Sequence, residues 1–473
     1  MNDSTAITGI ANPFLTDNTT FITPLGLGFT ILMGLLVLFL PRRFALLPIL
    51  AMICYMTMGM RVMVGGLNFT MIRVLLIFCW MRLVCRGEFR RMSINEIDKA
   101  LMWFIAISVI THTFLLGEDG LKYKLGQAYD ALGFYFFFRY LFRDWGEVVQ
   151  TAKMTALLLL PLALEMINEK LTLTNRFALF GGVSPYVILR EGTARAQGPF
   201  GHPILAGTFG ATLMPFMAAL WFQKGSGKFF AVVGMISATT IACMAGSSGP
   251  IMAYMFGVVS LAMWPIRRQM RSLRWGLLLT LITLHLVMKA PVWFLLARVS
   301  VFDASTGYHR AYLIDRCIAN FSGWWLIGTT SFGSWGYYLF DRTNHYICLA
   351  TDGGIMTLLL FLTILTRCFR GVGLVVREMT RRGFREGLWF AWAMGAALVI
   401  HCVSFISCTY FDQNMVNWYL LLAMISSSCS IWLNPAREVK IREKTARQRA
   451  AARTTVGDWL NPVREDEHPV PLG

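Results

Sequence analysis

Long apolar stretches recur along the chain from Leu25 to Leu433, and short polar connections separate them. Each stretch is about 17–22 residues long, close to the length that an α-helix needs to cross roughly 30 Å of hydrocarbon. The pattern therefore predicts about thirteen transmembrane helices. Their expected ranges are 24–40, 44–64, 69–85, 100–116, 121–142, 149–167, 203–222, 229–245, 250–265, 275–296, 346–366, 387–407 and 413–433.

The composition agrees with a membrane protein and excludes a soluble domain. Of the 473 residues, 56% are hydrophobic and only 15% are charged. We predict an all-α, polytopic integral membrane protein with about 12–13 transmembrane helices and two large periplasmic loops. The expected regions are a periplasmic segment 1–23, N-terminal helices 24–167, a periplasmic loop 168–202, central helices 203–296, a large periplasmic loop 297–345, C-terminal helices 346–433 and a basic cytoplasmic tail 434–473.

The first segment, 1–23, lacks the basic start and short apolar core of a cleaved signal peptide. We therefore expect the first span to be retained as an anchor.

The net charge of +17 is distributed in a way that argues against a nucleic-acid partner. Lys and Arg concentrate in every second connection, and cytoplasmic loops of membrane proteins carry this excess. We predict an outside N-terminus, an inside C-terminus and an odd number of spans, with Lys122 and Lys124 as the clearest exceptions. The tail can be a basic helix on anionic lipid or a solvated end. The basic connections are 42–43, 86–99, 139–144, 224–228, 267–274, 367–385 and the tail from 437 to 453.

Two long outer connections, 168–202 and 296–345, break the charge rule. Long loops are partly exempt from it, so these cations can be ordinary solvated arginines. Alternatively, a diphosphate substrate at the membrane surface would explain them, because arginine suits bidentate phosphate binding. The cations are Lys170, Arg176, Arg190 and Arg195 in one loop and Arg298, Arg310, Arg316 and Arg342 in the other.

Polar residues inside the spans are few. The ten cysteines show no metal-ligand or redox spacing and are interpreted as small core residues. His112, His285 and His401 stand alone in apolar runs and are expected to be satisfied core residues. Asp130 is different, because a carboxylate within a span is costly and usually faces an interior partner or a cavity. Arg139 lies about 13 Å farther along the same helix and cannot be that partner by helix packing.

Three segments carry specific residues at specific spacing. The first runs from Arg195 to Gly207 and opens a span, with Pro203 at the expected helix start. The second, 246–250, has the sequence GSSGP and forms a tight outer turn. The third runs from Tyr308 through Asp341 to Thr357, where another apolar run begins.

At these segments the sequence resembles the O-antigen ligase and polysaccharide polymerase family of bacterial envelope enzymes, over roughly 195–366. The resemblance implies a metal-independent glycosyltransferase that takes a glycan from undecaprenyl diphosphate on the outer side of the cytoplasmic membrane. The family's first signature, an arginine, a glycine and a helix-start proline, falls on Arg195, Gly198 and Pro203.

The family's second signature matches at Asn344, Gly354 and Thr357 but has Thr343 where the family has histidine. His345 lies two residues later. In a helix it would point roughly 200° away from the signature position, whereas in an extended loop it would return to the same face. The sequence leaves both geometries open.

The expected reaction needs cations on the departing diphosphate and a base near the acceptor hydroxyl. Catalytic candidates are His345 and Asp341 as bases and Arg195 as a cation. For His345 a packing role is the alternative, and for Arg310 and Arg316 the alternative is pairing with Asp303 or Asp315. The substrate-binding candidates are Arg310, Arg316, Asn344, His202 and Arg190.

We therefore predict a glycan polymerase or ligase of the bacterial inner membrane, with polymerase slightly favoured and the active site facing the periplasm. Expected partners are undecaprenyl-diphosphate-linked glycan, a glycan or lipid acceptor and membrane lipids, with no metal and no cofactor. A transporter or flippase of lipid-linked glycans is the alternative class, although transporters tend to show internal repeats and mid-span charges. A non-catalytic envelope scaffold is a third class, for which the loop motifs would be needless.

Overall fold

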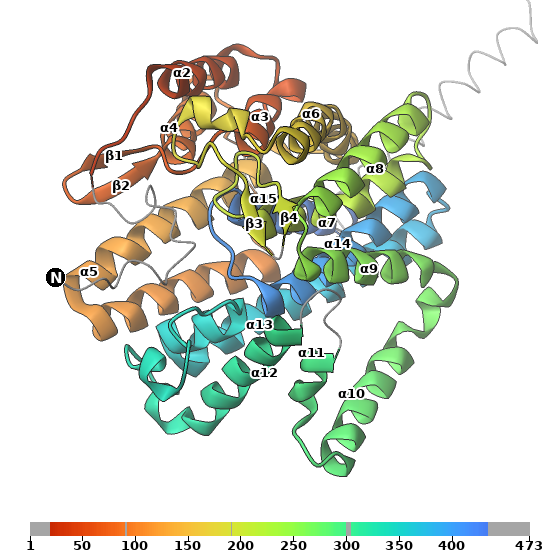
Figure 1. The fold of residues 1–473 in the computed structure, drawn as a ribbon. Helices are drawn as coiled ribbons and strands as arrows, with labels where there is room; N and C mark the ends of the chain where they lie inside the picture. Colours follow the sequence, from red (N-terminus) through yellow and green to blue (C-terminus); the bar gives the residue numbers. More distant parts are fainter. Residues whose placement is uncertain (1–18, 90–91, 191, 299–303, 434–473) are drawn as a thin grey trace, which may run out of the picture.

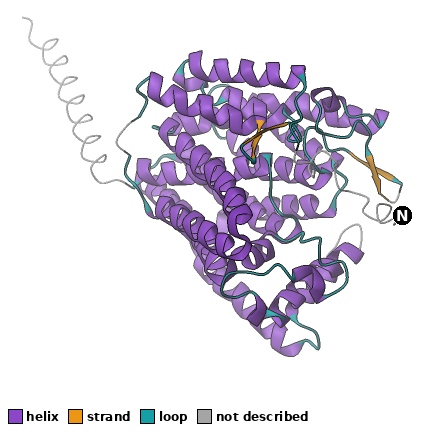
Figure 2. Ribbon diagram, turned by 90° about the vertical axis from the view of Figure 1, so that its left-hand side faces the viewer, coloured by secondary structure: helices purple, strands orange, loops and turns teal. Residues whose placement is uncertain are grey.

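The computed structural model describes residues 19–89, 92–190, 192–298 and 304–433. The described chain is helical apart from two antiparallel hairpins, β1 (Arg61–Val64) with β2 (Leu67–Thr70) and β3 (Ile188–Arg190) with β4 (Thr193–Arg195) (Figure 2). This confirms the all-α prediction, whereas the predictions for residues 1–18 and for the tail lie outside the described residues. The helices are α2 (Pro24–Phe39), α3 (Leu47–Tyr55), α4 (Met71–Cys85), α5 (Glu96–Leu141), α6 (Trp145–Thr172), α7 (Pro203–Leu220), α8 (Gly227–Met244), α9 (Ser248–Ala262), α10 (Met270–Val287), α11 (Leu295–Arg298), α12 (Ala304–Ala319), α13 (His345–Arg381), α14 (Arg385–Ser407) and α15 (Gln413–Trp432).

Seven described helices are long and apolar enough to cross a membrane, namely α5, α6, α7, α8, α13, α14 and α15. An eighth span is possible if α9 and the segment Trp264–Val287, which meet at 78°, count as one. These helices make the chain a multi-pass membrane protein. Helix α10, in the second half of that bent pair, projects from the bundle (Figure 1). It buries none of its side chains, as lipid-facing surface does.

The long helix α5 folds back on itself. Its backbone reverses at Gly117, where φ is +63°, a value that glycine adopts without strain. Asp98 near its start pairs with Arg139 near its end, with Oδ2 and Nη2 3.0 Å apart. Two antiparallel rods therefore lie within α5 (Figure 1), as the separate predictions 100–116 and 121–142 require.

Two predicted spans are wrong in their extent. The range 44–64 contains only the nine-residue α3 before β1 begins. After α3 the chain passes close to another loop, and a Cβ on Gly59 would lie 2.5 Å from the Cα of Gly182. The range 346–366 is interrupted at Gly354, where φ is +72° and the backbone packs against the carbonyl group of Leu326. Both runs are apolar, but contacts with distant backbone accompany the end of the helix in the first run and the kink of α13 in the second.

The predicted cytoplasmic connections meet at one end of the bundle, which we call the basic end. There Arg42 Nη2 lies 2.6 Å from Glu147 Oε1, and Lys224 Nζ lies 2.7 Å from Glu386 Oε1. Other contacts among these connections join Arg143 to Glu88, Arg367 to Glu96, Trp264 to Trp389 and Arg382 to Trp432.

The predicted outer connections meet at the opposite end, which we call the loop end. Phe21 forms an isolated bridge with Arg61, and Thr23 Oγ1 donates to the Phe180 carbonyl at 2.6 Å. Alternate connections therefore lie at opposite ends of the bundle, as a chain that crosses a membrane repeatedly requires.

Small residues bring the helices of the central bundle together. A Cβ on Gly210 of α7 would lie 2.7 Å from the Ala238 carbonyl oxygen of α8. A Cβ on Gly207 would lie 2.8 Å from both Ala245 and Pro250. Glycines at helix contacts permit this close approach in membranes. They hold the α8–α9 turn beside the start of α7, and this turn is central to the candidate site.

Candidate functional site

The α14–α15 connection, residues 407–412, joins several groups at the loop end. Thr409 Oγ1 donates to the Arg342 carbonyl at 2.6 Å, which ties the connection to the segment that precedes α13. The Tyr410 N–H donates to His345 Nδ1 at 3.4 Å. In the sequence this connection was only the gap between the predicted spans 387–407 and 413–433.

The start of α15 extends this network toward α3 and α7. The Gln413 amide nitrogen donates to the carbonyls of Met56 at 2.9 Å and Pro199 at 3.3 Å. The Asn414 amide nitrogen donates to the Leu205 carbonyl at 2.9 Å. Both side chains are almost fully buried, so these bonds fix the first turn of α15 against the 195–205 segment.

Arg195 lies at the end of β4 and is 3% exposed. Its Nε donates to the Ala245 carbonyl at 3.4 Å, and its Cγ lies 3.2 Å from where a Cβ on Gly246 would be. Burial and the charge of Arg190 lower the pKa of the Arg195 guanidinium. Arg195 therefore packs against the start of the α8–α9 turn.

Arg310 approaches the other end of the same turn from α12. Its Nη2 lies 3.3 Å from where a Cβ on Gly249 would be, and Ser407 Oγ lies 2.9 Å from that point. The structure thus brings Arg195 and Arg310 to one turn of four residues, 246–249, from which α9 begins.

Arg316 does not join this pair. Its Nη2 lies 2.9 Å from Asp315 Oδ2, and its guanidinium stacks on the Tyr312 ring at 5.2 Å. This is the alternative that the sequence left open, pairing within the loop. The other proposed partner, Asp303, lies outside the described residues.

His202 and Arg190 lie near Arg195. His202 Nδ1 accepts a hydrogen bond from the Ile204 N–H at 3.1 Å, so the imidazole caps α7. Burial, together with the charges of Arg195 and Arg190, lowers the pKa of His202 to about 4. His202 is therefore neutral near pH 7, which suits a cap that accepts a hydrogen bond.

The residues around the second signature have clear structural contacts. Asn344 Oδ1 accepts from the Ile347 N–H at 3.2 Å and caps α13. His345 is 7% exposed, and its ring stacks on Phe405 at 4.9 Å and also contacts the Phe361 ring at 5.5 Å. His345 therefore faces the aromatic interior.

Asp341, by contrast, is exposed. Its backbone carbonyl lies 3.2 Å from His309 Nε2, which places it beside the helix that carries Arg310. Thr343 is partly buried and follows Asp341 closely in the chain.

An ion pair that the sequence did not indicate links the segment before α13 to an early turn of that helix. Arg342 Nη1 pairs with Asp352 and donates to Thr351 Oγ1 at 2.8 Å. The Asp352 carbonyl lies 2.8 Å from His112 Nδ1, which joins this turn to the α5 hairpin. Lys124 points inward as well and is 6% exposed. Lys124 was recognisable in the sequence as an exception to the charge pattern, but the sequence did not show which residues surround it.

The partner of Asp130 is Arg73 on α4. The guanidinium Nη2 lies 2.7 Å from Asp130 Oδ2 and Nε lies 2.8 Å from Oδ1, which is a bidentate pair. The expectation of an interior partner for Asp130 is confirmed. Arg73 itself was not singled out, because 57 residues separate it from Asp130 in the chain.

Asp412 is a further acidic residue that sequence reasoning missed. Its φ is +55°, which is unusual for a residue other than glycine. Burial and the nearby Asp130 raise the pKa of the Asp412 carboxyl to about 7, although Arg73 opposes this. Its Oδ2 has no hydrogen-bond partner among the described residues.

The isolated histidines make single hydrogen bonds. His401 Nδ1 lies 3.0 Å from the Tyr410 hydroxyl, and both residues are buried. His285 Nδ1 accepts from the Val292 N–H at 3.3 Å, but α10 exposes this histidine, so its expected core position is wrong. Across the described ranges, no group of three or more His, Cys, Asp and Glu residues could hold a metal ion.

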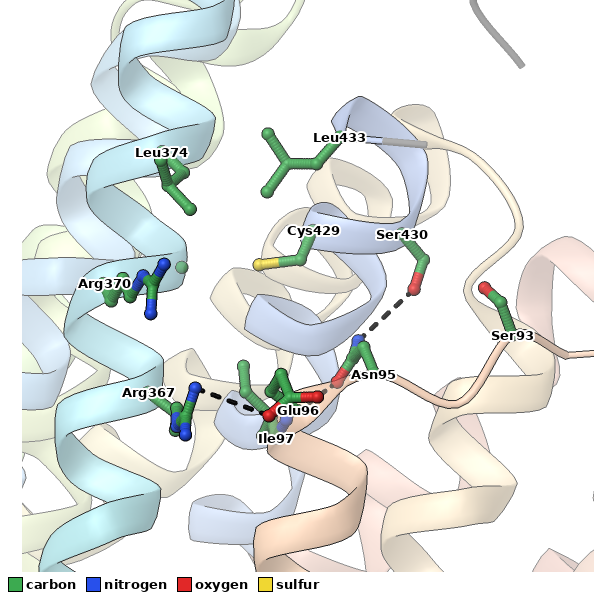
Figure 3. Close-up of a pocket in the computed structure, with 11 residues that line it drawn as sticks. Ser93, Asn95, Glu96, Ile97, Arg367, Arg370, Leu374, Cys429, Ser430 and Leu433 are labelled. Carbon is green, nitrogen blue, oxygen red and sulfur yellow. Dashed lines mark hydrogen bonds and ion pairs between the residues drawn. The ribbon is translucent and has the colours of Figure 1, made fainter. Parts of the chain in front are cut away.

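A hollow of about 560 Å³ lies at the basic end, between the start of α5, α13 and the end of α15 (Figure 3). It is at the opposite end of the bundle from Arg195, Arg310 and Asp341, and so it does not coincide with the active site that the sequence predicts. Comparisons with protein-family models and with curated proteins found no match to this chain.

Proposed function

We propose that the protein is a membrane glycosyltransferase of the polymerase or ligase type, which takes glycan from undecaprenyl diphosphate at the loop end. In this proposal the loop end faces the periplasm of a bacterial inner membrane. One observation carries it: Arg195 of β4 and Arg310 of α12, which are far apart in the chain, contact the two ends of the turn 246–249. The partial positive charge of the α9 N-terminus and two guanidinium groups suit a diphosphate.

The reaction follows from this placement. An acceptor hydroxyl attacks the anomeric carbon, the bond from that carbon to the diphosphate oxygen breaks, and the diphosphate leaves with the electron pair. Arg195 and Arg310 stabilise the departing negative charge. The hydroxyl proton passes to a base, and we assign this role to Asp341, which is exposed beside the helix that bears Arg310.

In the same proposal His345 positions the site and does not take the proton. Its Nδ1 already accepts the Tyr410 N–H, and its ring is enclosed by Phe405 and Phe361. It thereby holds the 407–412 connection against α13. The retained Asn344 supports the same local backbone as a helix cap.

A flippase for lipid-linked glycans is the second candidate. The Arg73–Asp130 pair lies within the predicted spans, and charges at membrane depth are typical of transport pathways. That pair is bidentate and largely buried, which equally suits a fixed structural contact.

The test uses purified protein with undecaprenyl-diphosphate-linked glycan, and gels report glycan length. Arg195→Ala and Arg310→Ala should each lower transfer by about a hundredfold or more, the effect of removing one stabilising group from a developing anion. Arg316→Ala is the matched control, because its guanidinium already pairs with Asp315, and it should leave transfer near normal.

Normal glycan products from both Arg195→Ala and Arg310→Ala would refute the proposal. The alternative makes a different prediction in sealed vesicles. A flippase moves lipid-linked glycan between leaflets without changing its length, whereas a transferase lengthens or relocates the glycan even in detergent, where there are no leaflets.

A further inference from the structure

The hollow at the basic end has a polar side and an apolar side. Asn95 caps α5 on the polar side, and its amide nitrogen donates to Ser430 Oγ at 3.4 Å. On the apolar side Leu374 and Leu433 approach each other across the opening (Figure 3). The volume, about 560 Å³, is within the range of small-molecule sites.

Two arginines, one turn apart on α13, line this hollow. Arg367 Nη1 lies 3.4 Å from Glu96 Oε2. Arg370 interacts with the Glu96 charge at longer range but forms no hydrogen bond with a described residue. Two guanidinium groups face one carboxylate, so the hollow carries a net positive charge.

The hollow lies where the surface of α13 changes from apolar to basic. The exposed side chains Met356, Leu359 and Leu362 are apolar, whereas Arg370 on the same helix is an exposed cation. Cations on a membrane helix gather where hydrocarbon gives way to lipid headgroups, so this end of α13 suits contact with a lipid phosphate.

We propose that an anionic phospholipid of the leaflet at the basic end binds in this hollow, with its phosphate on Arg367 and Arg370. Its acyl chains then run along the apolar surface of α13 that carries Leu359 and Leu362. Basic pockets between transmembrane helices favour anionic headgroups, and the apolar rim strengthens the contact by excluding water. The stretch 437–453, which follows Leu433 closely in the chain, carries seven Lys and Arg residues against two Glu, so its charge does not complement this site. The proposal does not depend on the glycosyltransferase function.

Native mass spectrometry of the full chain in neutral detergent tests this binding, with phosphatidylglycerol as the probe and phosphatidylcholine as the zwitterionic comparison. One arginine near an anionic headgroup is worth about a fivefold change in affinity. Arg370→Gln should therefore weaken phosphatidylglycerol binding about fivefold, and Arg367→Gln with Arg370→Gln about 25-fold. Arg370→Lys keeps the charge and should retain most of the binding.

The matched control is Arg377→Gln with Arg385→Gln, which removes the same charge outside the hollow and should leave binding unchanged. Among the described residues Arg370 has no hydrogen-bonded partner to lose, so its variants keep the fold, and elution as a single species checks this. Equal loss in the control pair, no loss in the Arg370 variants, or equal binding of phosphatidylcholine would each overturn the proposal. Displacement of the lipid by millimolar inorganic phosphate would also overturn it, in favour of a soluble anion.

Discussion

Replacing Asp412 with asparagine should stabilise the protein, and only above acidic pH. The carboxyl lies in the α14–α15 connection, near both Asp130 and Arg73. Its pKa is about 7 in the folded protein, compared with an ordinary value of 3.8. The folded state therefore disfavours the ionised carboxylate, and Asp412→Asn removes that group while keeping its shape.

The pH window follows from these two values. Below about pH 4 the carboxyl is protonated in both the folded and the unfolded protein, so it has no effect on stability. Between about pH 4 and pH 7 the unfolded chain releases its proton first, and the free energy of unfolding falls as pH rises. Above about pH 7 the loss is complete. A difference of about three pKa units corresponds to about 4 kcal/mol, an upper estimate for this half-buried group.

Thermal unfolding in detergent at several pH values measures this effect. The Tm of Asp412→Asn should match that of the wild type at pH 4 and exceed it by roughly several degrees at pH 8. Asp119→Asn, the same chemical change at the exposed tip of the α5 hairpin, should show no such trend. Two results would refute the reasoning. One is a Tm difference between Asp412→Asn and the wild type that does not vary with pH, and the other is a wild-type Tm above that of Asp412→Asn at pH 8.

Two further predictions concern the backbone and the topology. Gly354→Ala should destabilise the protein by at least about 2 kcal/mol in thermal unfolding, because φ is +72° and a Cβ would lie 2.7 Å from the Leu326 carbonyl carbon. Gly373→Ala on the same helix has open space around its Cβ and should be neutral or slightly stabilising. Equal Tm values for the two variants would contradict this. A reporter inserted after Arg381, at the basic end, should be active only if it is a cytoplasmic type, and a periplasmic signal there would reverse the assignment of the two ends.

Helix positions could be predicted best where an apolar run and its cap agree. The prediction 203–222 corresponds to α7, which begins at Pro203 after the His202 cap. The prediction 413–433 corresponds to α15, Gln413–Trp432. In these cases the length of the run and local chemistry at its start decide the boundary.

Predictions failed where distant backbone decides the geometry. The run 346–366 is equally apolar whether the helix is continuous or broken at Gly354, and the contact with Leu326 that accompanies the break is not visible in the local sequence. The same limit applies to ion pairs. Asp130 could be recognised as anomalous by itself, but Arg73 could be identified as its partner only from the packing of α4 against α5.

The second signature illustrates how a pattern can specify backbone shape without specifying chemistry. Asn344 caps α13, Gly354 provides the left-handed turn, and Thr357 Oγ1 donates to the Gly353 carbonyl at 2.7 Å. These retained residues can form the same turn whether position 343 is threonine or histidine. The proposed reaction therefore has to rest on Arg195, Arg310 and Asp341, which lie outside this signature. If Asp341→Asn leaves transfer intact while the arginine variants lower it about a hundredfold, cation stabilisation by Arg195 and Arg310 carries the reaction and Asp341 is not its base.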